Sequence, residues 1–122
     1  MARLISLQTF TDARGNLTVI EKVLPFEIKR IFYIYGTDQK ERGGHRHKST
    51  IQAAICLRGE CKVRSHDGQT ESTYHLNSPD KCLILQPEDY HSMFEFSADA
   101  MLMVVASTYF DEADYIFEPY TV

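Results

Sequence analysis

Short strand-like segments separated by turn signals recur along the whole chain, and this spacing constrains the fold most strongly. The segments are rich in β-branched, aromatic and aliphatic residues, and they cover 17–20, 28–35, 51–57, 61–65, 82–85 and 101–106. No long stretch has helical periodicity, and only residues 111–114 suggest a short helical turn. Regularly spaced short strands favour an all-β fold, either a closed barrel or a jelly roll, because both protect strand edges.

The turn signals are specific at three places. Arg14-Gly15-Asn16 breaks the first pair of strands, and Gly59 allows a tight turn later in the chain. Asp67-Gly68 separates residues 61–64 from residues 72–75. This dipeptide predicts a hairpin with a type I′ turn, which needs positive φ at both central residues.

Length and composition limit the classes of protein that this chain can form. The 122 residues, 43% of them hydrophobic, predict a single domain over residues 1–122. The net charge of −4 gives no reason to expect nucleic-acid binding, and no apolar run approaches the roughly 20 residues that span a bilayer.

The cysteines and the N-terminus predict a cytoplasmic location. Cys56, Cys61 and Cys82 are an odd number without a CxxC pair, which is typical of small core residues in a reducing compartment. The first residues lack the long apolar core of a signal peptide.

Three histidines form the first candidate site. His45 and His47 follow Gly43-Gly44 on an extended segment, so their side chains should point to the same side of a strand. His91 follows an apolar strand. Such a set could serve acid–base chemistry or metal binding, although single histidines of this kind are often solvated loop residues.

Three arginines form the second candidate set. Arg30 lies among apolar residues of a strand, where a guanidinium needs an anionic partner or an exit to water. Together with Arg14 and Arg42 it would suit a diphosphate, which guanidinium groups bind in a bidentate manner. The alternative is a set of surface salt bridges with Glu21, Glu27 or Glu41.

Two segments resemble the motifs of the cupin superfamily. They are His45-x-His47 with Gln52 and Gly59, and Pro87-x-Asp89-x-His91. The resemblance implies a cupin jelly-roll barrel. Cupins usually have a glutamate ligand where this chain has Ile51 and Gln52. Because hard and borderline divalent ions favour that carboxylate, we expect no metal and no other cofactor.

A more specific resemblance covers nearly the whole chain and is to the nucleotide-sugar 3,4-ketoisomerases, the WxcM-like cupins. The matching segments are Asp12-x-Arg14-Gly15-x-Leu17, 25–34, 42–48, 56–59 and 106–116. The resemblance implies conversion of dTDP-4-keto-6-deoxyglucose to a 3-keto sugar without a metal, as a step toward 3-amino sugars of bacterial surface glycans. It also implies a homodimer with exchanged N-terminal strands.

The residues suit such chemistry, since an imidazole with a pKa near ~6.5 can act as base and then as acid. We expect His47 to be the main base and His45 its partner, although the sequence hardly distinguishes which histidine has which role. Tyr33, Tyr35 or Tyr90 would donate to a sugar oxygen, and the three arginines would hold the diphosphate. The remaining expected substrate contacts are Gln52 and His91.

Two other functions stay open at this point. One is a metal-dependent cupin oxygenase or isomerase that uses the three histidines with Gln52. The other is a non-catalytic cupin that binds nucleotide sugars. The related epimerases of keto-deoxy sugars pair a histidine with an aspartate, and no such pattern is evident in the sequence.

Overall fold

The computed structural model describes residues 1–121, and strands make up nearly all of its regular structure. The strands are β1 Arg3–Ser6, β2 Gln8–Asp12, β3 Gly15–Val19, β4 Arg30–Tyr35, β5 Arg42–His47, β6 Gln52–Arg58, β7 Cys61–His66, β8 Glu71–Leu76, β9 Lys81–Leu85, β10 Tyr90–Phe94, β11 Met101–Ala106 and β12 Tyr115–Ile116. One short 3₁₀ helix, η1, covers Glu112–Asp114, where the sequence predicted a helical turn. The predicted all-β class is therefore confirmed.

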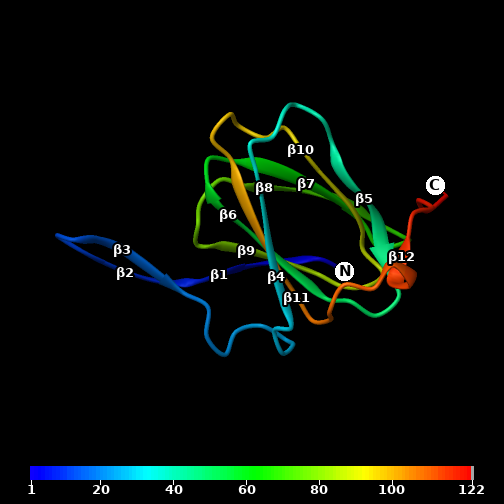
Figure 1. Ribbon diagram of the computed structural model, residues 1–122, viewed down its shortest axis with the longest axis horizontal. Coiled ribbons are helices and arrows are strands. Elements are labelled where there is room, and N and C mark those ends of the chain that lie inside the picture. Colours follow the sequence, from blue (N-terminus) through cyan, green and yellow to red (C-terminus); the bar gives the residue numbers. More distant parts are fainter. Residues whose placement is uncertain (122) are drawn as a thin grey trace.

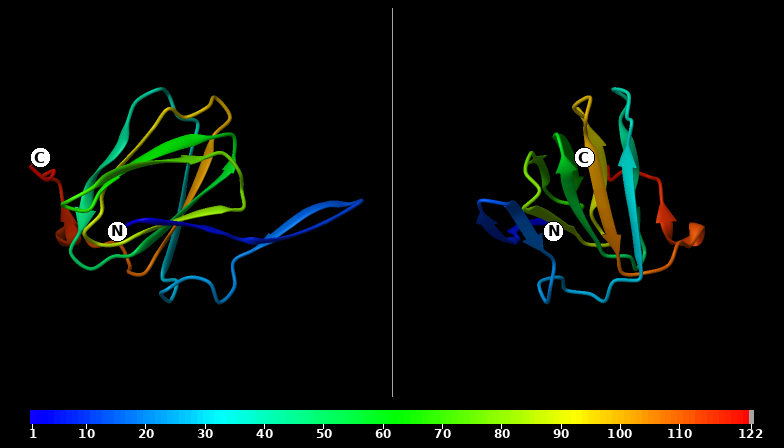
Figure 2. Two further views of the ribbon diagram at one scale, coloured as in Figure 1. Left: turned by 180° about the vertical axis from the view of Figure 1, so that it is seen from behind. Right: turned by 60° about the vertical axis from the view of Figure 1, so that its left-hand side comes forward.

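Two five-stranded antiparallel sheets form the body of the molecule (Figure 1). The first sheet has the order β1-β9-β6-β11-β4, and the second has the order β12-β5-β10-β7-β8. Figure 2 shows that the two sheets face each other and enclose an interior. This arrangement is the jelly-roll barrel of the cupins, as predicted. No helix among residues 1–121 is long and apolar enough to cross a membrane.

The hairpin β2–β3 stands apart from the body. It forms a two-stranded sheet of its own, and in Figures 1 and 2 it projects beyond the barrel. Its apolar residues Phe10 and Leu17 are 55% and 60% exposed. An isolated two-stranded hairpin is only marginally stable in water, and within residues 1–121 these two side chains have little apolar packing.

Strand β4 shows how alternation fills the interior. Phe32 and Ile34 pack against the core, whereas Tyr33 and Tyr35 are 60% and 65% exposed on the opposite face. The three cysteines are buried and unpaired, as the sequence suggested. The core therefore depends on apolar burial and contains no disulfide.

The Asp67-Gly68 hairpin is present, but its turn differs from the prediction. Residues 67–70 connect β7 to β8, and Asp67 N–H donates to the Thr70 carbonyl at 3.2 Å. The Asp67 carboxylate accepts from the amides of Gln69 and Thr70, at 2.9 and 2.8 Å. The aspartate therefore stabilises a four-residue loop with its side chain, and only Gly68 has positive φ there.

Candidate functional site

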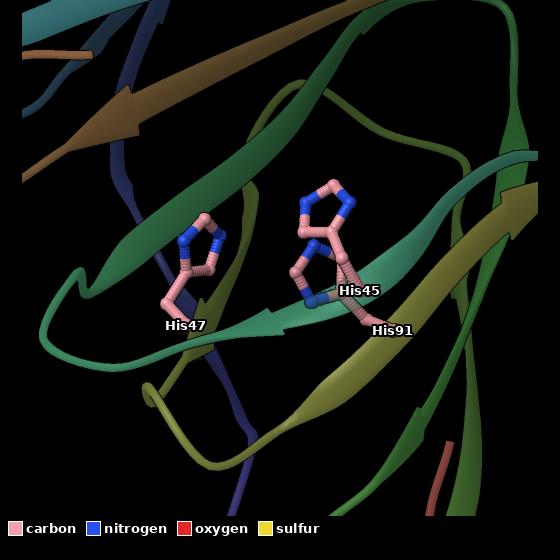
Figure 3. Close-up of side chains that lie close together, drawn as sticks. All are labelled: His45, His47 and His91. Atoms are coloured by element: carbon pink, nitrogen blue, oxygen red, sulfur yellow. The ribbon is translucent and has the colours of Figure 1, made fainter. Parts of the chain in front are cut away.

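His45 and His47 point from β5 into the barrel, as the period-2 alternation predicts. Their ring centroids lie 5.0 Å apart. His91 on β10 approaches from the neighbouring strand, with its ring 4.9 Å from that of His45 (Figure 3). The three side chains offer ligand-type nitrogens that all lie within 4.8 Å of one another. The predicted cluster is therefore assembled in space.

Gly43 lets β5 and β10 approach closely enough to form this cluster. The two strands pair His45 with His91, and the register shifts next to that pair. Gly43 has φ of 86°, and a Cβ there would lie 3.0 Å from the His91 carbonyl oxygen and 3.2 Å from Met93 Sδ. A larger residue would therefore be strained at this φ and crowded against β10, which explains the glycine before the histidine pair.

His47 is held by an aspartate that is remote in sequence. Its Nδ1 lies 2.9 Å from Oδ2 of Asp114, the last residue of η1, directly before β12. Asp114 also accepts hydrogen bonds from Ser49 and from the Thr50 hydroxyl. Partial burial raises the pKa of Asp114, but the hydrogen bonds from Thr50, Ser49 and His47 outweigh it and lower the pKa to about 2.

This contact fixes the tautomer of His47. Because the Asp114 carboxylate is ionised, it only accepts, so His47 Nδ1 carries the proton. His47 is 3% exposed, and its Nε2 has no hydrogen-bond partner among residues 1–121. Burial lowers the pKa of His47, and the Asp114 carboxylate opposes that shift. The result is a neutral imidazole with a free Nε2 lone pair.

His91 and His45 are held in the neutral form as well. Nδ1 of His91 donates to the Asp89 carbonyl at 3.0 Å, and burial lowers the pKa of His91 to about 3. Burial and the neighbouring His47 lower the pKa of His45 to about 4, against the effect of the Gly43 carbonyl. All three imidazoles are therefore bases rather than cations at neutral pH.

His45 and His91 line a cavity of about 140 Å³, and His47 lies next to them outside its lining. The polar part of its lining consists of Arg42, His45, Gln52, His91 and Tyr115, and the rest is mostly apolar, including Phe32, Ala54, Val63, Met93 and Val104. Strand registers place the apolar residues one layer deeper, because Met93 pairs with Val63 and Val104 pairs with both Phe32 and Ala54. The cavity thus has a polar rim at His45, His91 and Gln52 and an apolar floor. Arg42 lies level with the floor, because it pairs with Met93.

Several of the predicted site residues meet here and others do not. Arg30 is half-buried at the start of β4, where its charge acts on His47, and its guanidinium lies over Phe32 and Phe110. Tyr90, next to His91 on β10, lines a separate groove with Arg64 and Tyr120. The predicted roles of Tyr33, Tyr35 and Tyr90 therefore find no support in this cavity, because alternation turns all three outward.

Arg14 is also remote from the histidines. It lies at the turn of the projecting hairpin β2–β3, and its Nη2 pairs with Asp12 at 2.6 Å. Both the ion pair and its surroundings are exposed to solvent. Within one chain, Arg14 contributes nothing to the cavity.

Sequence reasoning missed two residues of the site. Asp114 belongs to residues 106–116, which resemble a family motif, but nothing local connects it with His47, which lies 67 positions earlier. Tyr115 follows it, lines the cavity and places its ring 4.7 Å from both His45 and His47. The only local signal is the Asp111-Glu112-Ala113-Asp114 turn, which does not indicate where the Asp114 carboxylate points.

The fold and the histidine cluster define a protein of the cupin class, a jelly-roll barrel with histidines facing its interior. The family model described as "FdtA: WxcM-like, C-terminal" matches residues 1–121. The chain therefore belongs to the WxcM-like family.

Individual relatives agree with this assignment. The chain is 43% identical, over 93% of its length and 84% of the relative, to the TDP-4-oxo-6-deoxy-α-D-glucose-3,4-oxoisomerase of Aneurinibacillus thermoaerophilus. A mutant of the 3,4-ketoisomerase QdtA from Thermoanaerobacterium thermosaccharolyticum, solved with TDP-4-keto-6-deoxyglucose, is 39% identical with a TM-score of 0.91, over 96% of this chain and 87% of that one. The TDP-quinovose 3,4-ketoisomerase of Campylobacter jejuni is 38% identical with a TM-score of 0.92, over 96% and 92%.

Proposed function

We propose that this chain is a nucleotide-sugar 3,4-ketoisomerase that converts dTDP-4-keto-6-deoxyglucose to the 3-keto sugar. The observation that carries this proposal is the cluster of three neutral histidines, two of which line a small cavity, in a chain of the WxcM-like family. The A. thermoaerophilus relative has this kind of activity by its name. The product would supply 3-amino-sugar synthesis for surface glycans.

The size and lining of the cavity suit the sugar of the substrate and not its nucleoside or diphosphate. A cavity of about 150 Å³ is known to admit one six-membered ring such as benzene. The cavity of about 140 Å³ would therefore admit part of the hexose, while the nucleoside and diphosphate stay outside. The apolar floor formed by Val63, Met93 and Val104 suits the C6 methyl of a 6-deoxy sugar, because it offers no partner to a C6 hydroxyl.

The reaction requires two proton movements and no net redox change. A base removes the C3 hydrogen as a proton, and the C4 carbonyl oxygen gains a proton, which gives an enediol. A proton then returns to C4 while the O3 hydroxyl loses its own, so that C3 becomes the carbonyl carbon. Neutral imidazoles suit both movements, and a positioned base typically contributes ~10²–10⁴ in rate.

The geometry suggests how the histidines share this work. His45 lines the cavity, whereas His47 lies behind it against Tyr115 and is bound to Asp114. We therefore place His45 against the carbon proton and His47 in the transfer between the sugar oxygens, the reverse of the order expected from sequence. His91 and Gln52 would hold the sugar hydroxyls at the rim.

The arginines would hold the diphosphate outside the cavity. Arg42 lines the cavity opposite Met93, and Arg30 has a buried Nε without a hydrogen-bond partner among residues 1–121. A guanidinium with an unused donor is suited to a phosphate oxygen. Arg14 would join them from a second subunit.

We propose a homodimer with exchanged N-terminal strands for this reason. The hairpin β2–β3 exposes Phe10 and Leu17 and pairs with no other strand among residues 1–121. The edge strand β4 exposes Ile31, Tyr33 and Tyr35. A second copy that covers these apolar residues with its hairpin would stabilise both and would bring its Arg14 toward the neighbouring site.

Residues 1–122 would act as one catalytic domain, and the unpaired Cys56, Cys61 and Cys82 suit the reducing cytoplasm.

A metal-dependent cupin enzyme is the second candidate, and one observation favours it. His47 and His91 give their Nδ1 protons to a carboxylate and a carbonyl, which leaves each Nε2 free, as in many metal-binding histidines. Three histidines without a carboxylate are sufficient for zinc. His45, His47 and His91 would hold such an ion, which would polarise a substrate oxygen as a Lewis acid.

A direct assay separates these functions. Purified protein is incubated with dTDP-4-keto-6-deoxyglucose, and the sugar is followed by NMR. A 3-keto product formed in the presence of a chelator supports the proposal. Binding of the substrate without any product would leave a non-catalytic nucleotide-sugar-binding protein.

A further inference from the structure

The segment that follows Tyr115 crosses the outside of the second sheet, and Tyr120 anchors it there. We call residues 115–120 the C-terminal strap. The Tyr120 hydroxyl donates to the Glu88 carbonyl at 2.8 Å. The ring lies 4.6 Å from Cζ of Arg46 and 5.4 Å from the ring of His66. Tyr120 therefore contacts three separate segments of the barrel.

Two of these segments carry the histidines of the site. Arg46 stands between His45 and His47 on β5, so its side chain leaves the sheet on the opposite face. Glu88 lies in the loop between β9 and β10. In this loop the Pro87 carbonyl accepts from His47 N–H at 2.9 Å, and the Asp89 carbonyl accepts from His91 Nδ1.

The other end of the strap reaches into the site. Tyr115 packs against His45 and His47, and Asp114 immediately before the strap orients His47. The strap is attached to β5 by β12, which has only two residues, Tyr115 and Ile116. So short a strand has few hydrogen bonds of its own, and such segments open at low free energy. A second anchor beyond it is therefore needed to keep Tyr115 in place.

We propose that Tyr120 is a positioning residue of the ketoisomerase site, which acts from outside the barrel through the C-terminal strap. It does not line the cavity. By joining the strap to Arg46 and to the Glu88 loop, it holds Tyr115 and Asp114 in register with the histidines. This inference rests on the proposed function for its catalytic consequence, but its structural part is independent of it.

The alternative is that Tyr120 is a surface tyrosine that contributes only to overall stability. The chain provides a matched control. Tyr74 also donates its hydroxyl to a backbone carbonyl, that of Ala2, at 3.1 Å, and it lies on β8 at the far edge of the second sheet. Tyr74→Phe and Tyr120→Phe therefore remove the same kind of hydrogen bond from different places.

The test combines hydrogen exchange of residues 114–117 with kcat, KM and dTDP affinity for both variants. Loss of one hydrogen bond changes an equilibrium about 2- to 10-fold. We expect Tyr120→Phe to increase exchange in this segment by such a factor and to lower kcat by a similar one, with KM and dTDP affinity unchanged. Tyr74→Phe should leave exchange of the segment and kcat as in the wild type.

Other results would overturn the positioning role of Tyr120 or the proposed function. Wild-type exchange and wild-type kcat in Tyr120→Phe would overturn the inference, and so would equal losses in both variants accompanied by equal losses of thermal stability. If the wild-type protein isomerises no sugar, the proposed function fails. The exchange measurement then still decides whether Tyr120 holds the strap.

Discussion

The Asp114 carboxylate accepts a hydrogen bond from Nδ1 of His47 across 2.9 Å, although the two residues lie 67 positions apart in the chain. The contact makes one nitrogen of His47 a donor and leaves the other as a free base. The site therefore contains a histidine–aspartate pair, which is not evident from the sequence. The segment that ends at Asp114 is therefore part of the site.

Asp114→Asn should lower kcat by about 10²–10⁴, because the amide no longer fixes the tautomer or supports a positive charge on His47. KM should change little, since Asp114 does not line the cavity. Asp111→Asn is the matched control, because Asp111 caps η1 through Ala113 N–H and asparagine is an equally good cap. Steady-state kinetics of both variants provide the measurement. Equal kinetics for the two would show that the His47–Asp114 contact is only structural.

The acid limb of the pH profile should lie below the ordinary histidine pKa of about 6.5. The bases must be neutral to accept a proton, and burial lowers the pKa of His47 and brings that of His45 to about 4. We therefore expect kcat/KM to stay level as the pH falls from 7.5 to 6.5 and to decline only at lower pH. The profile of kcat/KM reports the pKa values of the free enzyme. An acid limb at or above 6.5 would contradict the assignment of buried neutral bases.

Exhaustive chelation should leave the activity intact. The proton transfers need only imidazoles, and the usual carboxylate ligand of cupins is replaced by Ile51 and Gln52. The measurement is kcat before and after dialysis against EDTA, with zinc analysis of the same samples. Loss of activity that a single divalent metal restores would instead establish the metal-dependent cupin, with His45, His47 and His91 as ligands.

Arg14 should act in the site of the neighbouring subunit. Arg14→Ala is expected to weaken dTDP binding by ~2–5 kcal/mol, which calorimetry measures directly. Arg14→Lys should recover only part of this affinity, because the bidentate fork is lost. Folding should be unaffected, since Arg14 pairs only with Asp12 on the exposed hairpin.

Subunit mixing tests the exchange itself. At substrate concentrations well below the wild-type KM, Arg14→Ala and His45→Asn should each show little activity, but a refolded mixture should regain about a quarter of the wild-type activity. Random pairing makes about half of the dimers mixed, and each mixed dimer has one complete site. A mixture that stays inactive would place Arg14 outside the neighbouring site.

The histidine cluster was predictable because its signal is local. A two-residue spacing on a strand fixes one face, and glycines before it allow a close approach of strands. Asp114 was not predictable in this way, since its role depends on η1 and β12 returning to β5. Such long-range contacts leave no periodic signal in the chain.

The directions of the tyrosines were ambiguous for a different reason. In β4 both faces are rich in apolar and aromatic residues, so alternation does not reveal which of Phe32 or Tyr33 points inward. A shift of one residue exchanges the two faces, and only the packing of the barrel decides between them. The apolar outer face is itself informative, because it indicates a surface that a second chain would cover.

The central claim is tested most directly by incubating the wild type and the His45→Asn and His47→Asn variants with dTDP-4-keto-6-deoxyglucose and identifying the sugar by NMR. His75→Asn serves as the control, because His75 is an exposed residue bound to Glu60. We predict a 3-keto product from the wild type and from the control. The two site variants should give no product or strongly reduced turnover, while they still fold and bind dTDP. Failure of the wild type to form a 3-keto sugar, or near-wild-type turnover in both site variants, would contradict the account.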